Sequence, residues 1–214
     1  MISRRDRERE LRKEIIADAA LSLFTSESYK SVTVQDIAKA AEYGKGTLYQ
    51  YFESKEDILI YIMERGIDEL CREIEARCYP DTDPMAAIYT YMLLQYNYYV
   101  KYSHMIFSLL RQRLEGTLTR ERLKEVWRIR NKKYELLAGI IERGVNQGIF
   151  ISADSQKLAR ILHNIVRGFS MESLENKGQG VEIEPDFNLI KQVISSGIVN
   201  LREGELSEPG DGSC

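Results

Sequence analysis

The sequence has no excess of positive charge. Its 30 Lys and Arg residues face 33 Asp and Glu residues, which gives a net charge of -3 and a pI of about 5.6. Residues 1–60 are no more basic than the rest. This charge balance excludes a surface that attracts polyanions in general. Any binding to nucleic acid must therefore depend on a few well-placed cations within a specific motif.

Cysteine is scarce too. Cys71, Cys78 and Cys214 form no CxxC pair, so we expect reduced thiols rather than a disulfide framework. The N-terminus lacks the apolar stretch of a signal peptide. The longest uncharged run, residues 84–100, contains five tyrosines, which favours a buried helix over a membrane span. We expect a cytoplasmic protein.

The chain has only two histidines, and no motif of an enzyme surrounds them. His104 and His163 fall on different predicted helices, and neither belongs to a metal-binding or nucleophile motif. The sequence also lacks a phosphate-binding loop. We therefore expect no catalytic residue, no metal and no cofactor, and the chain is not predicted to be an enzyme.

Helical periodicity is what the sequence has in abundance. Apolar residues recur every three to four positions, without a sustained alternation of β-branched residues, so we predict an all-α fold of about nine helices. Four prolines and 14 glycines leave few breaks, the clearest of which is CYPDTDPMAA. The predicted helices cover residues 9–26, 33–42, 45–52, 54–78, 84–102, 104–114, 119–146, 154–174 and 186–201.

The second and third of these helices have the spacing of a helix-turn-helix. Thr33 and Asp36 form the pattern of a helix N-cap, and residues 42–44 end that helix. Leu48 and Phe52 are predicted to anchor the next helix. Ser54, followed by Asp57, predicts the N-cap of the helix after it. The basic and acidic residues before the first helix form either a solvated helical extension or an arm that reaches DNA.

With these motifs in place, the chain resembles the TetR family of bacterial transcriptional regulators. The resemblance rests on IADAALSLF and on TVQDIAKAAEYGKGTLYQYFESKEDIL, and it covers about residues 10–60. It implies an N-terminal three-helix helix-turn-helix DNA-binding domain over residues 1–53 and a larger C-terminal helical domain for effector binding and dimerisation over residues 54–203. Residues 204–214 have little to bury and are expected to be a disordered tail.

Two positions depart from the family pattern, because Ser28 and Glu42 stand where the family commonly has glycine. A residue held there at positive φ is strained unless it is glycine. We expect either a tolerated left-handed conformation or an altered turn.

The resemblance also assigns residues to the DNA interface. Glutamine can read adenine, threonine can contact a base edge or a thymine methyl group, and tyrosine and lysine can bind phosphate. A glycine allows the helix backbone to approach DNA closely. The expected DNA-binding residues are Thr33, Gln35, Lys45, Gly46, Thr47, Tyr49, Gln50, Tyr51 and Lys55.

Aromatic residues form stripes on the predicted helices of the larger helical part, and these stripes are candidates for an effector site. Two such stripes can line a cavity for an apolar or aromatic ligand, or they can simply be core. Arg111, Arg128, Arg130, His104 and His163 offer charges for an anionic ligand, or are ordinary surface and core residues. The predicted effector residues are Met63, Tyr89, Met92, Tyr96, Tyr99, Phe107, Leu123, Trp127, Tyr134 and His163.

The last two predicted helices carry apolar sets that can meet those of a second copy in a four-helix bundle. The predicted dimerisation residues are Leu158, Ile161, Leu162, Ile165, Phe169, Leu189, Val193, Ile194 and Ile198.

The sequence as a whole predicts a ligand-responsive transcriptional regulator. We expect a homodimeric repressor that binds a palindromic operator in double-stranded DNA and is released by a small hydrophobic or aromatic effector, with no membrane partner. Activation instead of repression stays open. The alternative is a helical protein-interaction adaptor that has lost DNA binding.

Overall fold

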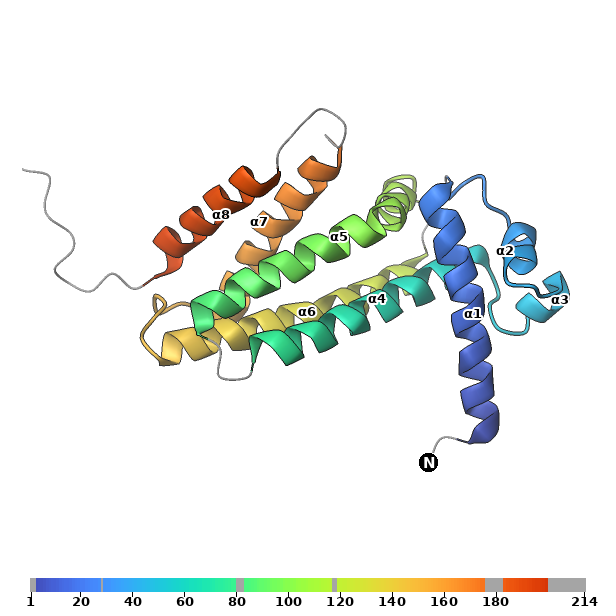
Figure 1. Ribbon diagram of the computed structural model, residues 1–214, viewed down its shortest axis with the longest axis horizontal. Helices are drawn as coiled ribbons and strands as arrows, with labels where there is room; N and C mark the ends of the chain where they lie inside the picture. The colour runs from blue at the N-terminus through green and yellow to red at the C-terminus, as the bar shows by residue number, and fades with distance from the viewer. Residues whose placement is uncertain (1–2, 28, 80–82, 117–118, 176–182, 200–214) are drawn as a thin grey trace, which may run out of the picture. The chain divides into compact units, whose positions relative to one another are not determined.

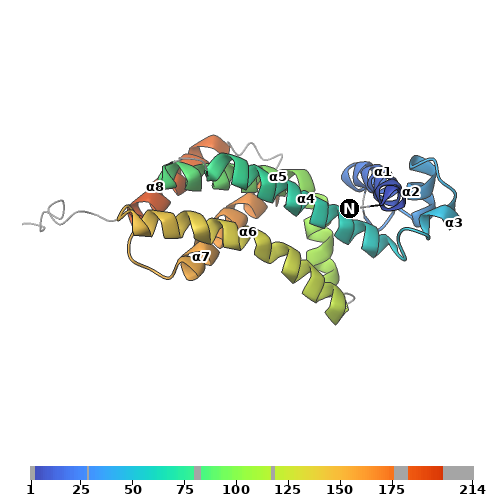
Figure 2. The same cartoon turned by 90° about the horizontal axis from the view of Figure 1, so that it is seen from below.

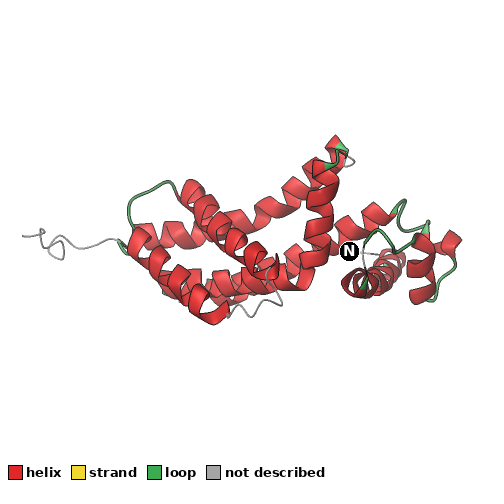
Figure 3. Cartoon of the chain, turned by 90° about the horizontal axis from the view of Figure 1, so that it is seen from above, coloured by secondary structure: helices red, strands yellow, loops and turns green. Residues whose placement is uncertain are grey.

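The structure is a computed structural model that describes residues 3–27, 29–79, 83–116, 119–175 and 183–199. Every regular element among these residues is a helix, and an isolated bridge pairs Phe150 with Val199 (Figure 3). The all-α prediction is confirmed. In order along the chain, the helices are α1 (Arg4–Ser26), α2 (Val34–Ala40), α3 (Lys45–Leu48), α4 (Lys55–Cys78), α5 (Pro84–Leu114), α6 (Arg120–Asn146), α7 (Ser155–Glu175) and α8 (Ile183–Ile198) (Figure 1).

Side-chain caps fix where several helices begin. Thr33 and Asp36 form a capping box at the start of α2, where each side chain bonds the backbone N–H of the other. The hydroxyl of Ser54 accepts from the Asp57 N–H at 3.1 Å, and Asp83 accepts from the Ala86 N–H at 2.9 Å. The predicted caps at Thr33 and Ser54 are confirmed.

Three predicted helix boundaries are wrong. α1 begins at Arg4 because Ser3 and Asp6 form a capping box that starts the helix earlier. α5 is continuous where two helices were predicted, since Ser103 stays helical and its hydroxyl donates to the carbonyl of Val100 at 3.3 Å. α3 ends at Leu48 rather than at residue 52.

The chain forms two compact units. One contains residues 1–72 and 95–133, and the other contains residues 73–94 and 134–214. The predicted domain boundary after residue 53 stays a prediction, and the predicted tail, residues 204–214, lies outside the described residues.

The first unit contains the helix-turn-helix, and α2 and α3 lie beside α1 in two views (Figures 1 and 2). Ile16, Ala20 and Phe24 of α1 are fully buried, as are Ile37 of α2 and Leu48 of α3. Burial of these apolar side chains is the main force that holds such short helices in place.

The second unit has its own core. Phe150 packs so closely on Gly144 of α6 that its ring occupies the place of a β-carbon there. The Ile151 N–H donates to the carbonyl of Ile198 at 2.9 Å, which ties the end of α8 to the segment before α7. In the described part of the chain, no helix has the length and apolarity that crossing a membrane requires.

Candidate functional site

The turn between α2 and α3 is built around Glu42, which has a φ of 59°. The Tyr43 N–H donates to the Ala38 carbonyl at 2.8 Å, and the Glu42 N–H donates to the Lys39 carbonyl at 3.1 Å. These two bonds are those of a Schellman motif, which places its left-handed residue directly after the helix. Either a tolerated left-handed conformation or an altered turn was expected at Glu42, and the structure shows the left-handed conformation. Ser28 lies outside the described residues.

The segment of residues 45–52, here called the recognition segment, presents a polar face. Leu48 and Phe52 are buried and hold it on the core, while Lys45, Gly46 and Gln50 are exposed. The Tyr49 side chain is 47% exposed although it is large and aromatic. A β-carbon added at Gly46 would meet nothing within 4 Å. The segment therefore leaves open space in front of its backbone, which a close-packed partner requires. Thr47 and Tyr51 are half-buried.

Thr33 and Gln35 are exposed at the start of α2. The Thr33 hydroxyl donates to the Asp36 carboxylate at 2.6 Å, and this bond helps to lower the pKa of Asp36. Thr33 thus serves as the cap of α2, and its predicted contact to DNA stays a prediction.

Lys55 points back into the protein rather than outward. Its ammonium donates to the carbonyls of Tyr29 at 2.7 Å and Val32 at 2.8 Å, and it lies 4.2 Å from the centre of the Tyr29 ring. Partial burial lowers the pKa of Lys55. The side chain therefore clamps the connection between α1 and α2. Its predicted contact to phosphate stays a prediction.

Two arginines of α1 reach the recognition segment, and the sequence analysis missed both contacts. Arg9 donates to the carbonyl of Gln50 at 3.1 Å, and Arg12 lies 3.4 Å from the hydroxyl of Tyr51. These pairs are 41 and 39 residues apart in the sequence. The mixed charges in the first half of α1 were visible in the sequence, but they gave no signal of these partners.

One predicted effector residue of the first unit, Tyr99, lies close to a buried cation. The Lys133 ammonium is 5.3 Å from the centre of the Tyr98 ring and 5.2 Å from that of Tyr99, and this lysine is only 2% exposed. Tyr99 is buried, whereas Met63, Tyr96 and Phe107 are half-buried. The side chains of Leu123 and Trp127 lie outside the described residues.

The predicted effector residues of the second unit include a fully buried histidine. The Nδ1 atom of His163 lies 2.9 Å from the hydroxyl of Tyr91, and the edge of its ring meets the Tyr134 ring with centroids 4.6 Å apart. Met92 is buried, and Tyr89 is half-buried. Tyr91 is not among the predicted effector residues.

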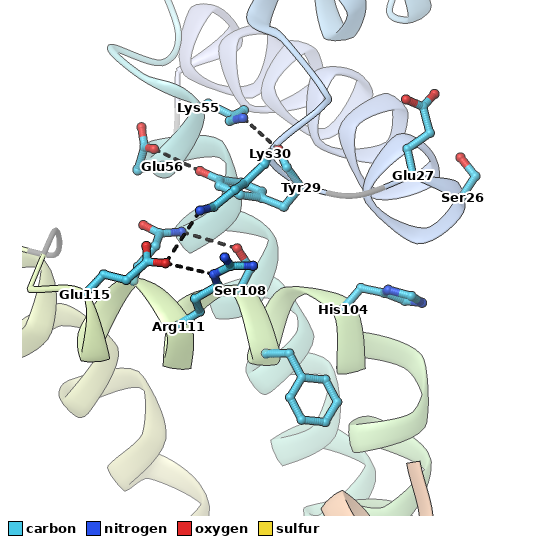
Figure 4. A pocket seen from close by; sticks show the side chains of 12 residues that line it. Ser26, Glu27, Tyr29, Lys30, Lys55, Glu56, His104, Ser108, Arg111 and Glu115 are labelled. Carbon is cyan, nitrogen blue, oxygen red and sulfur yellow. Dashed lines mark hydrogen bonds and ion pairs between the residues drawn. The ribbon is translucent and has the colours of Figure 1, made fainter. Parts of the chain in front are cut away.

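A pocket of about 880 Å³ lies within the first unit, and Figure 4 shows the side chains around it. It is lined by the end of α1 and the residues after it, by the start of α4, and by residues 104–115 at the end of α5 and just beyond it. Lys30 and Arg111 both pair with Glu115, at 3.5 Å and 2.8 Å. The lining also contains Lys55, Glu27 and Glu56, so three cations stand against three carboxylates, and the pocket has little of the character of an anion site. Phe107 is the predicted effector residue that lines it.

The predicted dimerisation residues divide into a buried set and an exposed set. Leu158, Leu162, Ile194 and Ile198 are buried within the protomer. Ile161 and Ile165 on α7, and Leu189 and Val193 on α8, are exposed. Phe169 is half-buried. Exposed large apolar side chains at helical spacing are typical of an interface.

Residues 16–62 match the model of the bacterial regulatory proteins of the tetR family. These residues span the end of α1, the helix-turn-helix and the start of α4. The helix-turn-helix part of the chain belongs to the TetR family. The chain is a DNA-binding transcriptional regulator.

Individual proteins of this kind resemble the chain over different lengths. The transcriptional repressor KstR2 of Rhodococcus jostii is 27% identical over 148 residues, which are 69% of this chain and 72% of the repressor. The regulator HbdR of Aromatoleum sp. is 34% identical over 86 residues, 38% of each chain. Both relatives are therefore similar to this chain over part of their length.

Among solved structures, a putative transcriptional regulator from Saccharomonospora viridis in complex with choline has a TM-score of 0.75 at 22% identity, covering 88% of this chain and 98% of that one. At this identity, the similarity concerns the fold alone. It extends the similarity in fold from the helix-turn-helix to the larger helical part.

Proposed function

We propose that this regulator is a homodimeric repressor that binds a palindromic operator and leaves it when a small hydrophobic or aromatic effector binds. The observation that best supports this proposal is the exposed face of the recognition segment. Tyr49 and Gln50 are exposed there, and a β-carbon at Gly46 would meet nothing within 4 Å. A short helix with polar side chains and no obstructing β-carbon suits the major groove. A regulator of this kind works on DNA, so we also propose that it is cytoplasmic.

The exposed apolar residues of α7 and α8 support the dimer. Ile161, Ile165, Leu189 and Val193 would be covered by the same residues of a second copy, as two-fold symmetry requires. Two recognition segments at a fixed separation would then read two half-sites, and this is the reason for a palindromic operator.

The buried tyrosines support the proposed effector class. Tyr91, Tyr134 and His163 combine aromatic surface with two groups that can exchange hydrogen bonds. An apolar ligand with a polar group suits such an environment. An effector would act by binding the DNA-incompetent arrangement more tightly than the competent one.

The experiment is selection of bound fragments from the source genome by the purified full-length protein, at moderate salt and with no added ligand. We expect one palindromic site, and its affinity should fall steeply as salt is raised, because phosphate contacts release counterions. Candidate effectors, added to the recovered complex, should release the DNA.

Two variants sharpen this test. Tyr49→Ala should weaken binding to the recovered site at least about tenfold, since it removes an exposed side chain of the recognition segment. Leu93→Ala, an equally exposed position on α5, should bind as the parent does. If a folded dimer retains no fragment, or if Tyr49→Ala binds normally, the adaptor alternative takes precedence.

A further inference from the structure

The C-terminal end of the recognition segment is not held by a regular helix. α3 spans only four residues, and its N-cap, Gly44, supplies no side-chain bond. After Tyr49, the Gln50 and Tyr51 N–H groups donate to the carbonyls of Thr47 and Leu48, three residues back. These bonds form a tight turn. The carbonyl of Gln50 lies where a helix end leaves acceptors without a helical partner.

Side chains of α1 supply what the turn lacks. Arg9 donates from Nη2 to the Gln50 carbonyl at 3.1 Å, and its guanidinium lies 5.4 Å from the centre of the Tyr51 ring. Arg12 donates from Nη1 to the Tyr51 hydroxyl at 3.4 Å. Arg12 is itself held by Glu8 at 2.8 Å, one helical turn away. One arginine thus bonds the backbone of the turn, and both contact its aromatic side chain.

We propose that Arg9 and Arg12 are positioning residues that fix the turn of Gln50 and Tyr51, and with it the direction in which Tyr49 and Gln50 meet DNA. The inference rests on the proposed function where it concerns DNA, because the recognition segment is taken as the part that reads the operator. Its structural half, that α1 holds the turn, stands independently of any operator.

Geometry favours this role over simple contact with phosphate. A planar guanidinium can bond a carbonyl and stack on an aromatic ring at the same time, which a lysine ammonium does poorly. Because a four-residue helix has no stability of its own, its pose depends on such tertiary contacts. Buried Leu48 and Phe52 hold one side of the segment, and the two arginines hold its end.

The first test needs no DNA. In the full-length protein, hydrogen exchange of the Gln50, Tyr51 and Phe52 amides should become about fivefold faster in Arg9→Ala, the change expected when one hydrogen bond of average strength is lost. Arg12→Ala should have a similar effect. Arg5→Ala, an exposed arginine on the same helix, is the matched control and should leave these amides unchanged. Unchanged exchange in both Arg9→Ala and Arg12→Ala overturns the proposal.

The second test uses the recovered operator. Arg9→Ala should bind about fivefold more weakly, with the same slope of affinity against salt as the parent, since no phosphate contact is lost. Arg9→Lys keeps the charge but not the planar group, so it should restore neither affinity nor slow exchange. A slope reduced by about one, with rescue by Arg9→Lys, would make Arg9 a phosphate contact and overturn the positioning role.

The two tests separate this inference from the proposed function. If no operator is recovered, the exchange experiment still decides whether α1 holds the turn. If an operator is recovered and the exchange rates do not change, the proposed function stands while the positioning role is overturned.

Discussion

Lys55 shows how far the type and place of a single residue predict its contacts. Its position at the start of α4 could be predicted from the Ser54 cap, because the cap depends on residues three positions apart. Its two carbonyl partners, Tyr29 and Val32, lie 26 and 23 residues earlier in the chain. Contacts at that separation depend on tertiary packing, so the sequence pattern could not show that this cation is turned inward.

Gly46 allows the DNA interface to be tested separately from folding. Gly46→Ala should raise the free energy of unfolding by up to about 1 kcal/mol, because alanine favours a helix and the added methyl group meets nothing within 4 Å. The same methyl group should lower operator affinity about tenfold by keeping the backbone from the DNA. Urea unfolding and a binding titration, with Leu93→Ala as control, measure both quantities. Parental affinity in a stabilised Gly46→Ala would remove this glycine from the interface.

At the scale of elements, the sequence predicted helix identity well and helix length less well. The predicted caps of α2 and α4 are short-range patterns, and they are confirmed. The predicted break near residue 103 is wrong because Ser103 bonds back to Val100 and α5 continues. The predicted end of the recognition helix at residue 52 is wrong because its last turn tightens and takes part of its support from α1.

The packing of α4 on α5 depends on a glycine. A β-carbon at Gly66 would lie 2.6 Å from the Tyr102 ring, closer than carbon atoms approach. Gly66→Ala should lower the free energy of unfolding by about 1–2 kcal/mol, since the cost of overpacking exceeds the gain in helix propensity.

Urea unfolding of Gly66→Ala checks this expectation. The double variant Gly66→Ala with Tyr102→Leu should be less destabilised than the two separate changes would predict, because the smaller side chain leaves room for the methyl group. Additive effects in this cycle, or a Gly66→Ala as stable as the parent, would show that Tyr102 does not confine the glycine.

For the molecule as a whole, the apolar residues that lie outside the protomer core indicate where a second copy would bind. The sequence predicted nine dimerisation residues as one set, because helical periodicity does not distinguish a face turned inward from one turned toward a partner. The structure places four of them in the protomer core and leaves Ile161, Ile165, Leu189 and Val193 exposed. An exposed apolar set of this kind costs free energy in water unless a partner covers it.

The double variant Ile161→Glu with Val193→Glu should therefore dissociate the proposed dimer. These side chains are 56% and 59% exposed, so charged replacements are compatible with the folded protomer. Symmetry replaces each side chain twice, and at a cost of at least about 1 kcal/mol per site the dissociation constant should rise about a thousandfold. Sedimentation measures the molar mass, and circular dichroism should show unchanged helicity. Leu93→Glu, at a position on α5 that is 44% exposed, should stay dimeric. Because both half-sites must be bound together, the dissociated variant should also lose operator affinity. A double variant that stays dimeric would place the interface elsewhere on the chain.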